Sequence, residues 1–302
     1  MHWDDVESYR REAGHLAGTW YDLGTAAGTF GVGLKRIQVD PGKWSTPAHS
    51  EGAEEEIFWI LAGSGISWQD GSAYRVGAGD CLVHLPEEAA HTLRAGPEGL
   101  EALAFGQRLP QGNTVLPRAG VAWMSPSWVD VGGPHPWERE AAAGEPEVGE
   151  LLERPPNIVD VAGGIRYDIH GGGIDVDLGT PAGSFATGLS HMTLPPGAEG
   201  YPPHWHAAEE ELFVVLRGSG TVVLGDEEED VRPGHVVACP PGRRVPHSFR
   251  AGDDGLTYLA YSTRIPNDIV YYSRSDKVNF RGIGLITRLE RLDYWDGDPA
   301  AD

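Results

Sequence analysis

The chain has few cysteines and no long apolar run. Only two cysteines, Cys81 and Cys239, occur in 302 residues. They lie in different halves of the chain and inside apolar runs, so no disulfide is indicated and buried thiols in a reducing compartment are expected. No stretch of 18 apolar residues occurs, and residues 1–18 are too charged for a signal peptide. The sequence therefore predicts a cytoplasmic protein with no membrane partner.

Positive charge is also scarce. The chain has 23 lysines and arginines against 45 aspartates and glutamates, which gives a formal net charge of −22. Such a chain repels phosphate backbones, so nucleic acid is not expected among its partners. The sequence shows neither a Ser-His-Asp arrangement nor a phosphate-binding loop. Any catalysis is therefore expected to depend on another kind of group.

Glycine and proline, in contrast, are abundant. The 42 glycines and 23 prolines make up just over a fifth of the chain, whereas average usage is about 12%. Pairs such as Pro41-Gly42 and Pro196-Gly197 indicate tight turns between short strands. A helical bundle is excluded because each interior glycine or proline costs a helix about 1–3 kcal/mol. With 40% hydrophobic residues and ten tryptophans, a folded β protein is predicted rather than a disordered chain.

The sequence contains an internal repeat with an offset of 155 residues. The clearest matches are DLGTAAGTFGVGL (22–34) with DLGTPAGSFATGL (177–189), EEEIFWILAGSG (54–65) with EEELFVVLRGSG (209–220), and, after a slip of one residue, HTLRAG (91–96) with HSFRAG (247–252). Spacing that is kept over about 75 residues indicates a tandem duplication of one β domain.

Each copy is predicted to be an all-β unit. Short runs rich in Val, Ile and Phe alternate with Gly and Pro at intervals of about ten residues, which is typical of sandwiches and barrels. Helix is expected only at the edges, as in residues 4–16. The predicted organisation is an N-terminal helical arm, a first β domain, a Pro/Gly-rich interdomain linker, a second β domain and a C-terminal extension (1–19, 20–117, 118–157, 158–272 and 273–302).

The linker and the extension differ in what can be predicted for them. In the linker, Trp123, Trp128 and Trp137 are expected to pack on a neighbouring surface. For the extension, one strand followed by a loop is the most that the pattern indicates.

Histidines and carboxylates gather at one place in the second copy. His204 and His206 are two residues apart, so on a strand both rings leave the same face. Glu211 opens the next apolar strand, and His247 follows a Pro-Gly turn further on. Mixed nitrogen and oxygen ligation of this kind suits Fe, Mn, Ni, Cu or Zn. The pattern predicts a site for one divalent transition metal.

Strand parity predicts the walls around this site. Apolar side chains on the same strand faces are expected to line a small-molecule pocket in each copy, Phe213, Val215 and Phe249 in the second and Phe58, Ile60 and Leu93 in the first.

These residues resemble the motifs of the cupins, and the duplication resembles a two-domain cupin, or bicupin. The first cupin motif is His, one residue, His, three or four residues, Glu, six residues and Gly. It is matched by His204, His206, Glu211 and Gly218. The second motif is matched by Gly234, Pro240 and Gly242, with His247 two residues later than usual and Ala251 where Asn is frequent. The resemblance implies two jelly-roll (double-stranded β-helix) barrels in tandem, with a metal inside the second.

The first copy departs from the motif. The aligned pairs are His49 with His204, Glu56 with Glu211 and His91 with His247, whereas Glu51 stands where the second histidine belongs. Two histidines and two carboxylates can hold a second divalent cation with a preference for harder metals. A decayed site that is kept for packing is the alternative, and both stay open.

Two charged groups beside the motifs are expected to be ordinary surface. Of the acidic triplets at 54–56 and 209–211, only the last member has the motif spacing, so the first two are expected in solvated loops. Arg243 and Arg244 are expected in a surface turn.

The function is not chosen by the resemblance alone. Bicupins include ring-cleaving and flavonol dioxygenases, oxalate decarboxylases and ureidoglycine aminohydrolases, and one fold serves many reactions. The leading hypothesis is a metal-dependent enzyme, with dioxygenase chemistry first, that acts on a small oxygen-bearing organic molecule. The alternative is a non-catalytic small-molecule-binding or sensor cupin. Either a monomer or a homodimer is expected.

Overall fold

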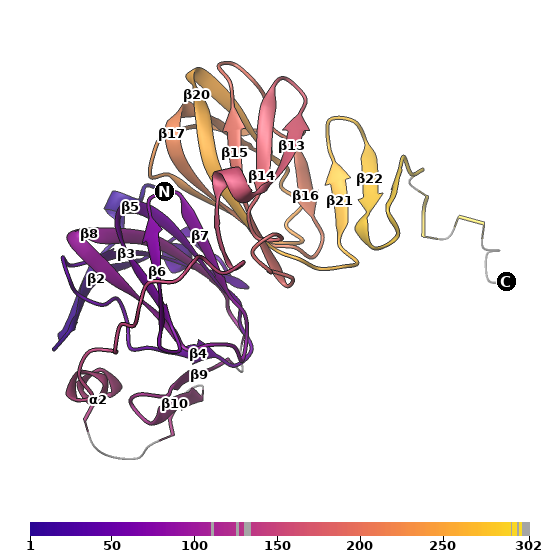
Figure 1. The fold of residues 1–302 in the computed structure, drawn as a ribbon. Helices are drawn as coiled ribbons and strands as arrows, with labels where there is room; N and C mark the ends of the chain where they lie inside the picture. Colours follow the sequence, from indigo (N-terminus) through magenta and orange to yellow (C-terminus); the bar gives the residue numbers. More distant parts are fainter. Residues whose placement is uncertain (110–111, 125–126, 130–133, 291, 295, 298–302) are drawn as a thin grey trace.

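The computed structural model describes residues 1–109, 112–124, 127–129, 134–290, 292–294 and 296–297, which form two β-rich domains lying side by side (Figure 1). The predicted linker and C-terminal extension each include residues outside this description, 125–126 and 130–133 in the linker and 291, 295 and 298–302 in the extension. No helix among the described residues has the length and apolar character needed to cross a membrane.

The first domain consists of a large antiparallel sheet and a small one. The large sheet has the order β1-β2-β3-β8-β5-β7-β12, with β6 on β5, and the small sheet has the order β11-β10-β9-β4. The elements are β1 (Ser8–Ala13), β2 (Leu16–Asp22), α1 (Leu23–Ala27), β3 (Val32–Val39), β4 (Ser50–Glu51), β5 (Glu56–Gln69), β6 (Ser72–Gly77), β7 (Asp80–His84), β8 (His91–Gln107), β9 (Asn113–Leu116), β10 (Val121–Met124), β11 (Ser127–Trp128), α2 (Pro136–Ala142) and β12 (Ile158–Asp160).

The second domain repeats this plan in one continuous sheet. Its main path is β13-β14-β15-β20-β16-β21-β22-β23, and β17 pairs with β18, β19 and β20. The elements are β13 (Ile165–Ile169), β14 (Gly173–Asp177), β15 (Thr187–Leu194), β16 (His204–His206), β17 (Glu211–Leu224), β18 (Glu227–Val231), β19 (Val236–Cys239), β20 (His247–Thr263), β21 (Ile269–Tyr272), β22 (Lys277–Phe280) and β23 (Leu285–Thr287). Single 3-10 turns lie at Trp3–Asp5, Val161–Gly163 and Arg281–Ile283.

The predicted all-β tandem architecture is confirmed, with one difference in detail. The strand ladders of the described residues end at edge strands such as β1 and β13, so they do not close into rings. The two domains are therefore jelly rolls rather than closed barrels.

The motif glycines permit a close approach of two long strands. In the second domain, β17 and β20 pair along most of their length, with register shifts near Gly218. Gly218 has φ +75°, and a Cβ there would collide with the carbonyl oxygen of Gly255. A bulge at this place bends the strand, and only glycine combines the positive φ with the backbone contact. Gly63 is in the same situation against Gly99 in the first domain.

Each domain has its own apolar core, and a third core lies between the domains. The interior of the first domain includes Ile60 and Leu93, and that of the second includes Val215 and Phe249. The largest cluster of buried apolar residues draws equally on both domains, with equivalent residues such as Leu34 and Leu189 on the two sides. The domains are thus joined by a pseudo-symmetric hydrophobic interface.

Backbone pairing also joins the two domains in both directions. β12, which was expected to open the second domain, pairs with β7 of the first domain through Ile158↔Leu82. In return, the start of the chain pairs with the edge of the second domain: the Trp3 N–H donates to the Gly234 carbonyl (2.9 Å), and the Val236 N–H to that of Met1 (3.0 Å). Each domain therefore completes a sheet edge of the other.

The predicted N-terminal helical arm is wrong. Residues 8–22 form the β1–β2 hairpin, whose turn has Gly14 at φ +58°. β1 is almost fully exposed, so no apolar stripe marks it as strand or helix, and its pairing with β2 decides its conformation. The equivalent hairpin in the second domain is β13–β14.

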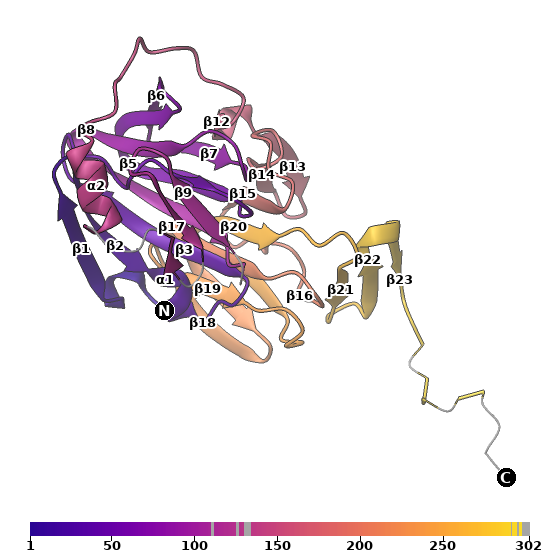
Figure 2. The ribbon, with the colours of Figure 1, turned by 90° about the horizontal axis from the view of Figure 1, so that it is seen from below.

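The linker and the extension are equivalent parts of the repeat. β9 and β10 pair antiparallel beside β4, and β21 and β22 pair in the same way beside β16. The linker therefore continues the first domain, and the described part of the extension contains two strands, β22 and β23, rather than one. Figure 2 shows β21–β23 projecting away from the second domain.

The acidic residues that precede the motif glutamates are buried, contrary to expectation. Glu55 accepts hydrogen bonds from the backbone N–H groups of residues 185–187 in the second domain, at 2.9, 2.8 and 3.2 Å. Glu210 accepts from residues 30–32 of the first domain, at 3.0, 2.6 and 3.1 Å. Both side chains are buried. Their carboxylates cap turns of the opposite domain, which is why the residues are not solvated.

Candidate functional site

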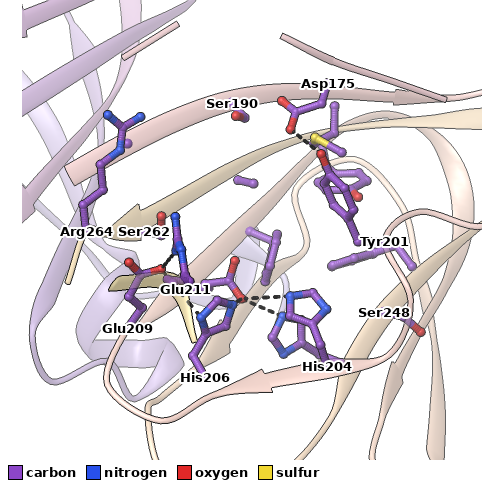
Figure 3. Close-up of a pocket in the computed structure, with 18 residues that line it drawn as sticks. Asp175, Ser190, Tyr201, His204, His206, Glu209, Glu211, Ser248, Ser262 and Arg264 are labelled. Carbon is purple, nitrogen blue, oxygen red and sulfur yellow. Dashed lines mark hydrogen bonds and ion pairs between the residues drawn. The ribbon is translucent and has the colours of Figure 1, made fainter. Parts of the chain in front are cut away.

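Four side chains of the second domain converge where three strands begin or pair. His204 and His206 lie on β16, Glu211 is the first residue of β17, and His247 is the first residue of β20. The Oε2 atom of Glu211 lies 3.7 Å from His204 Nε2, 3.2 Å from His206 Nε2 and 2.7 Å from His247 Nε2. Figure 3 shows the side chains of His204, His206 and Glu211 turned toward one another. The strand pairing His204↔His247 brings the two outer histidines together.

The donor atoms of this group are suited to a metal ion. Nε2 of His206, Nε2 of His247 and Oε2 of Glu211 are buried and form no hydrogen bond of good geometry among the described residues, although Oε2 lies 3.2 and 2.7 Å from the two nitrogens. The ligating atoms of His204, His206 and Glu211 lie within 4.8 Å of one another. Buried polar atoms are rarely left without partners, so unpaired and converging atoms fit a divalent cation.

The pKa values of three side chains at the site are shifted strongly by burial and by their charged neighbours. Burial opposes the charge of Glu211, but His247 and His206 outweigh it and hold its pKa well below the usual 4.5. Burial also opposes the charge of His206, yet the hydrogen bond to Asp268 and the close contact with the charge of Glu211 raise its pKa to about 10. Burial and repulsion from His247 lower the pKa of His204 to about 4. The carboxylates thus draw a proton into the group, and the same negative charge favours a metal cation that displaces it.

Asp268 orients His206 and was not found by sequence reasoning. Its Oδ2 atom lies 2.6 Å from His206 Nδ1, and its Oδ1 atom accepts from the N–H groups of Ala208 (2.8 Å) and Glu209 (3.3 Å). Asp268 is completely buried. In the neutral imidazole this bond keeps the proton on Nδ1 and leaves the Nε2 lone pair facing Glu211.

Behind Asp268, a second buried carboxylate completes the support. Glu209 accepts a hydrogen bond from the Ile265 N–H (2.8 Å) and pairs with Arg281. Its Oε2 atom lies 3.6 Å from His206 Nδ1. His206 is therefore held by two acidic residues in addition to Glu211.

The four residues open onto a cavity of about 230 Å³. Phe213 and Phe249 line it, as strand parity predicts, whereas Val215 lies deeper in the core. Polar groups that were not predicted also line it, among them Asp175, Ser190 and Tyr201. Arg243 and Arg244 are not among its lining residues; Arg243 instead lies 5.7 Å from the ring centre of Phe30.

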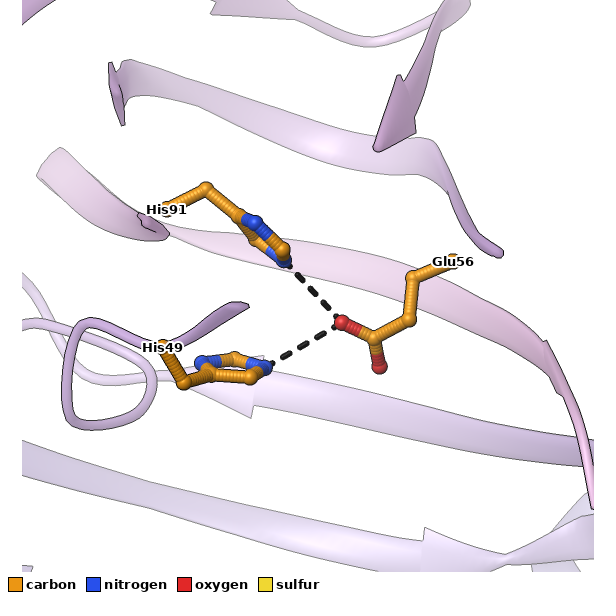
Figure 4. A group of neighbouring side chains, drawn as sticks. All are labelled: His49, Glu56 and His91. Atoms are coloured by element: carbon orange, nitrogen blue, oxygen red, sulfur yellow. Dashed lines mark hydrogen bonds and ion pairs between the residues drawn. The ribbon is translucent and has the colours of Figure 1, made fainter. Parts of the chain in front are cut away.

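The equivalent group in the first domain is organised differently. His49 and His91 both direct Nε2 to one oxygen of Glu56, at 3.1 and 3.0 Å (Figure 4). Glu51 accepts a hydrogen bond from Thr114 Oγ1 (2.6 Å), and its other oxygen is 3.9 Å from His49 Nε2. These side chains satisfy one another, unlike those of the second domain.

The protonation of His49 follows from its contacts. Nδ1 lies 2.9 Å from the Pro47 carbonyl and Nε2 lies 3.1 Å from Glu56, so both ring nitrogens face acceptors. Burial opposes the charge, but the hydrogen bond to Glu56 and the charges of Glu56 and Glu51 raise the pKa to about 9. The ion pair with Glu56 therefore keeps a proton on His49 that a metal would have to displace, as for His206 in the second domain. The ligand atoms of His49, Glu56 and His91 also lie within 4.8 Å of one another.

Aromatic side chains close the cavity of the first domain. Phe58, Trp128 and Trp137 line it, while Ile60 and Leu93 belong to the core beneath. Trp137 lies edge-on to Trp20, with ring centres 5.4 Å apart, and Trp123 packs on Trp128 in the same way. The linker tryptophans thus pack on the first domain or on each other. The ring of His84 stacks on His91 at 3.6 Å.

Both halves of the chain match the same family model. The model of the cupin domain matches residues 35–105 and residues 190–260. Among curated proteins, conglutin alpha 3 of Lupinus angustifolius is 33% identical over 89 residues, which cover 28% of this chain and only 14% of the lupin protein.

Solved structures with the same two-domain arrangement are oxalate decarboxylases. The enzyme of Lactobacillus farciminis superposes with a TM-score of 0.60 at 15% identity, covering 87% of this chain and 85% of the other. A variant of the Bacillus subtilis enzyme superposes with a TM-score of 0.60 at 16% identity, covering 88% and 79%. At these identities the likeness concerns the fold.

Proposed function

This chain is a two-domain cupin, and we propose that it is a metal-dependent enzyme that acts on a small oxygen-bearing organic molecule in its second domain. One observation carries the proposal: Nε2 of His206, Nε2 of His247 and Oε2 of Glu211 are buried, converge and form no hydrogen bond of good geometry among the described residues. A conserved packing role would not require unpaired polar atoms, since unpaired burial is costly. The cavity above them, which both aromatic and polar side chains line, has the form of a small-molecule site.

The protein residues have separate tasks in this proposal. His204, His206, Glu211 and His247 would hold one divalent transition metal, which supplies Lewis-acid chemistry toward substrate oxygens and, as iron, dioxygen chemistry. Asp268 fixes the orientation of His206. Phe213 and Phe249 line the cavity and keep water from the reacting group.

Dioxygenase chemistry is our first choice of reaction. It draws on a metal centre in an apolar cavity and does not need a protein nucleophile. Neither cysteine offers one: burial raises the pKa of Cys239 well above its usual value and raises that of Cys81 as well. Decarboxylation, isomerisation and hydrolysis are the other reactions that such a centre could support.

We propose one metal ion per chain. Both first-domain histidines are hydrogen-bonded to Glu56, and Glu51 stands in place of the second motif histidine, which favours a packing role for this group over a second metal. Elemental analysis of the reconstituted protein tests this directly, with about one equivalent expected. The double variant His204→Ala, His206→Ala is expected to lose the metal, whereas the matched first-domain variant His49→Ala, His91→Ala is expected to keep it.

Thermal unfolding of both variants separates loss of the site from loss of the fold. Full metal content in a folded His204→Ala, His206→Ala protein would contradict the proposal. Two equivalents in the wild type, with one lost in each variant, would instead establish a second metal in the first domain.

Turnover distinguishes an enzyme from the alternative, a small-molecule-binding or sensor cupin. Oxygen uptake by the iron-loaded protein, measured against a panel of phenolic and keto acids, is expected for at least one compound. Release of CO₂ without oxygen uptake would indicate a decarboxylase. Tight binding of panel members without any product would support the sensor.

A further inference from the structure

We infer that the substrate of the second-domain cavity carries a hydroxyl or amino group at the end away from the metal-binding side chains, and that Asp175 accepts a hydrogen bond from it. The inference deepens the proposed function and rests on it. It follows from the wall opposite the histidines, where the cavity is polar for no structural reason that the fold supplies.

Asp175 lies on β14 and lines the same cavity as Glu211. In Figure 3 it stands with Tyr201 well apart from His204, His206 and Glu211. The Tyr201 hydroxyl donates to Oδ2 of Asp175 at 2.8 Å. Oδ1 is buried and has no hydrogen-bond partner among the described residues. Ser190 is close enough to favour the charged carboxylate, but its geometry does not satisfy Oδ1.

An unpaired carboxylate oxygen in a buried place destabilises a protein unless something binds it. Burial raises the pKa of Asp175, which agrees with a group that is short of partners. Tyr201 holds the carboxylate in place from one side and leaves the other oxygen for a ligand in the cavity. The missing partner is therefore a hydrogen-bond donor.

The first domain shows that the fold itself does not need this acid. At the equivalent strand position, β2 carries Trp20, which is buried and packs edge-on against Trp137. Lys35 and Thr46 stand at the places of Ser190 and Tyr201 under the offset of 155 residues. The acidic wall thus occurs in the copy that has the unpaired metal-binding atoms, and is absent from the copy that lacks them.

The two polar ends are separated by apolar side chains. Met192, Phe249 and Tyr258 line the cavity and belong to the core of the second domain. A ligand that satisfies both ends has metal-binding oxygens at one end, an apolar middle and a donor at the other end. Hydroxylated and amino-substituted aromatic acids have this form.

The test uses zinc-loaded full-length protein and matched benzoates, with affinities measured by titration calorimetry. The probes are 3- and 4-hydroxybenzoate, 3- and 4-aminobenzoate, and the 3- and 4-methylbenzoates, which have similar size but no donor. At one ring position, the hydroxy or amino acid is expected to bind roughly tenfold or more tightly than the methyl acid. Equal affinities within every set, or no binding by any probe, would overturn the inference.

Variants assign the preference to Asp175. Asp175→Leu is expected to remove the advantage of the hydroxy or amino acid while the affinity for the methyl acid and the metal content stay unchanged. Trp20 shows that an apolar residue is tolerated at this strand position. Tyr201→Phe keeps the carboxylate and is expected to keep the preference. An advantage that survives in Asp175→Leu would exclude Asp175 as the acceptor.

Elemental analysis of the same samples keeps the two proposals apart. A wild-type protein that takes up no metal contradicts the proposed function. A metal-loaded protein that shows no preference for a donor contradicts only the role of Asp175.

Discussion

Residues outside the motif complete the candidate metal centre. His206 is held from behind by Asp268, and the first domain, which has Glu51 in place of the second histidine, has Gly112 at the position of Asp268. The second motif histidine and the aspartate that orients it are thus present together in the second copy and absent together from the first. This pairing indicates that Asp268 serves His206 rather than the strand that follows it.

Asp268→Asn is expected to weaken metal binding by about 10- to 100-fold, because the amide is a poorer acceptor for the Nδ1 proton of His206. Competition with a chromophoric chelator measures the change. Asp253→Asn, at an exposed position of β20, is the matched control and is expected to bind metal as the wild type does. Equal affinities in the two variants would show that Asp268 has only a packing role.

The sequence predicts the four converging residues but not their support. Spacing along two strands identifies His204, His206 and Glu211, since neighbouring positions in a motif become neighbours in space. Asp268 lies in the turn between β20 and β21 and Asp175 lies on β14, both far along the chain from Glu211, and the repeat offers no equivalent acid for either. Only the sheet pairing brings them to the site, so no local pattern could have identified them.

At the scale of elements, Glu55 links a loop of one domain to a turn of the other. Burial opposes its charge, but hydrogen bonds from Ala186, Ser184 and neighbouring groups lower its pKa below 4.5. A lowered pKa in the folded state means that the stabilisation is complete above about pH 4.5 and is lost as the pH falls through the folded value. The contact therefore contributes to acid unfolding.

Glu55→Gln is expected to lower the free energy of unfolding at pH 7 by about 2–3 kcal/mol, because charged acceptors form stronger hydrogen bonds than neutral ones. It is also expected to flatten the fall in stability below pH 4.5. Urea unfolding at several pH values measures both effects. Glu54→Gln, at the neighbouring position, is the control. A pH profile unchanged from that of the wild type would contradict the assigned role of Glu55.

Element boundaries near the ends of the repeat were the least predictable from sequence. The hairpin of β1 and β2 was expected to be a helix, because β1 carries charged residues on both faces and shows no strand alternation. Of the two strands in the described part of the extension, only one was predicted, since β23 is largely exposed and shows no buried face. Both regions take their conformation from pairing with another strand, which a short window of sequence does not contain.

At the scale of the whole molecule, the two domains behave as one folding unit. Their largest apolar cluster is shared, β12 pairs with the first domain, and the start of the chain forms backbone hydrogen bonds with the second. A protease site inserted between Gly149 and Glu150, in an exposed stretch, allows the chain to be cut without touching the interface. The two fragments are expected to co-elute in gel filtration and to unfold in one thermal transition. Separate elution or two transitions would show that the domains are independent.

The shared interface gives the first copy a structural role that does not depend on its pocket. The first copy buries its partner's apolar face whether or not its own pocket binds anything, so its loss would expose that face and cost the active copy its stability. Mutations that changed the first pocket could therefore accumulate without penalty, while the face that bears Leu34 and Ile57 stayed under constraint. If the first pocket binds nothing, as proposed, the apolar surface on the other side of the same strands is a sufficient reason to keep the first copy.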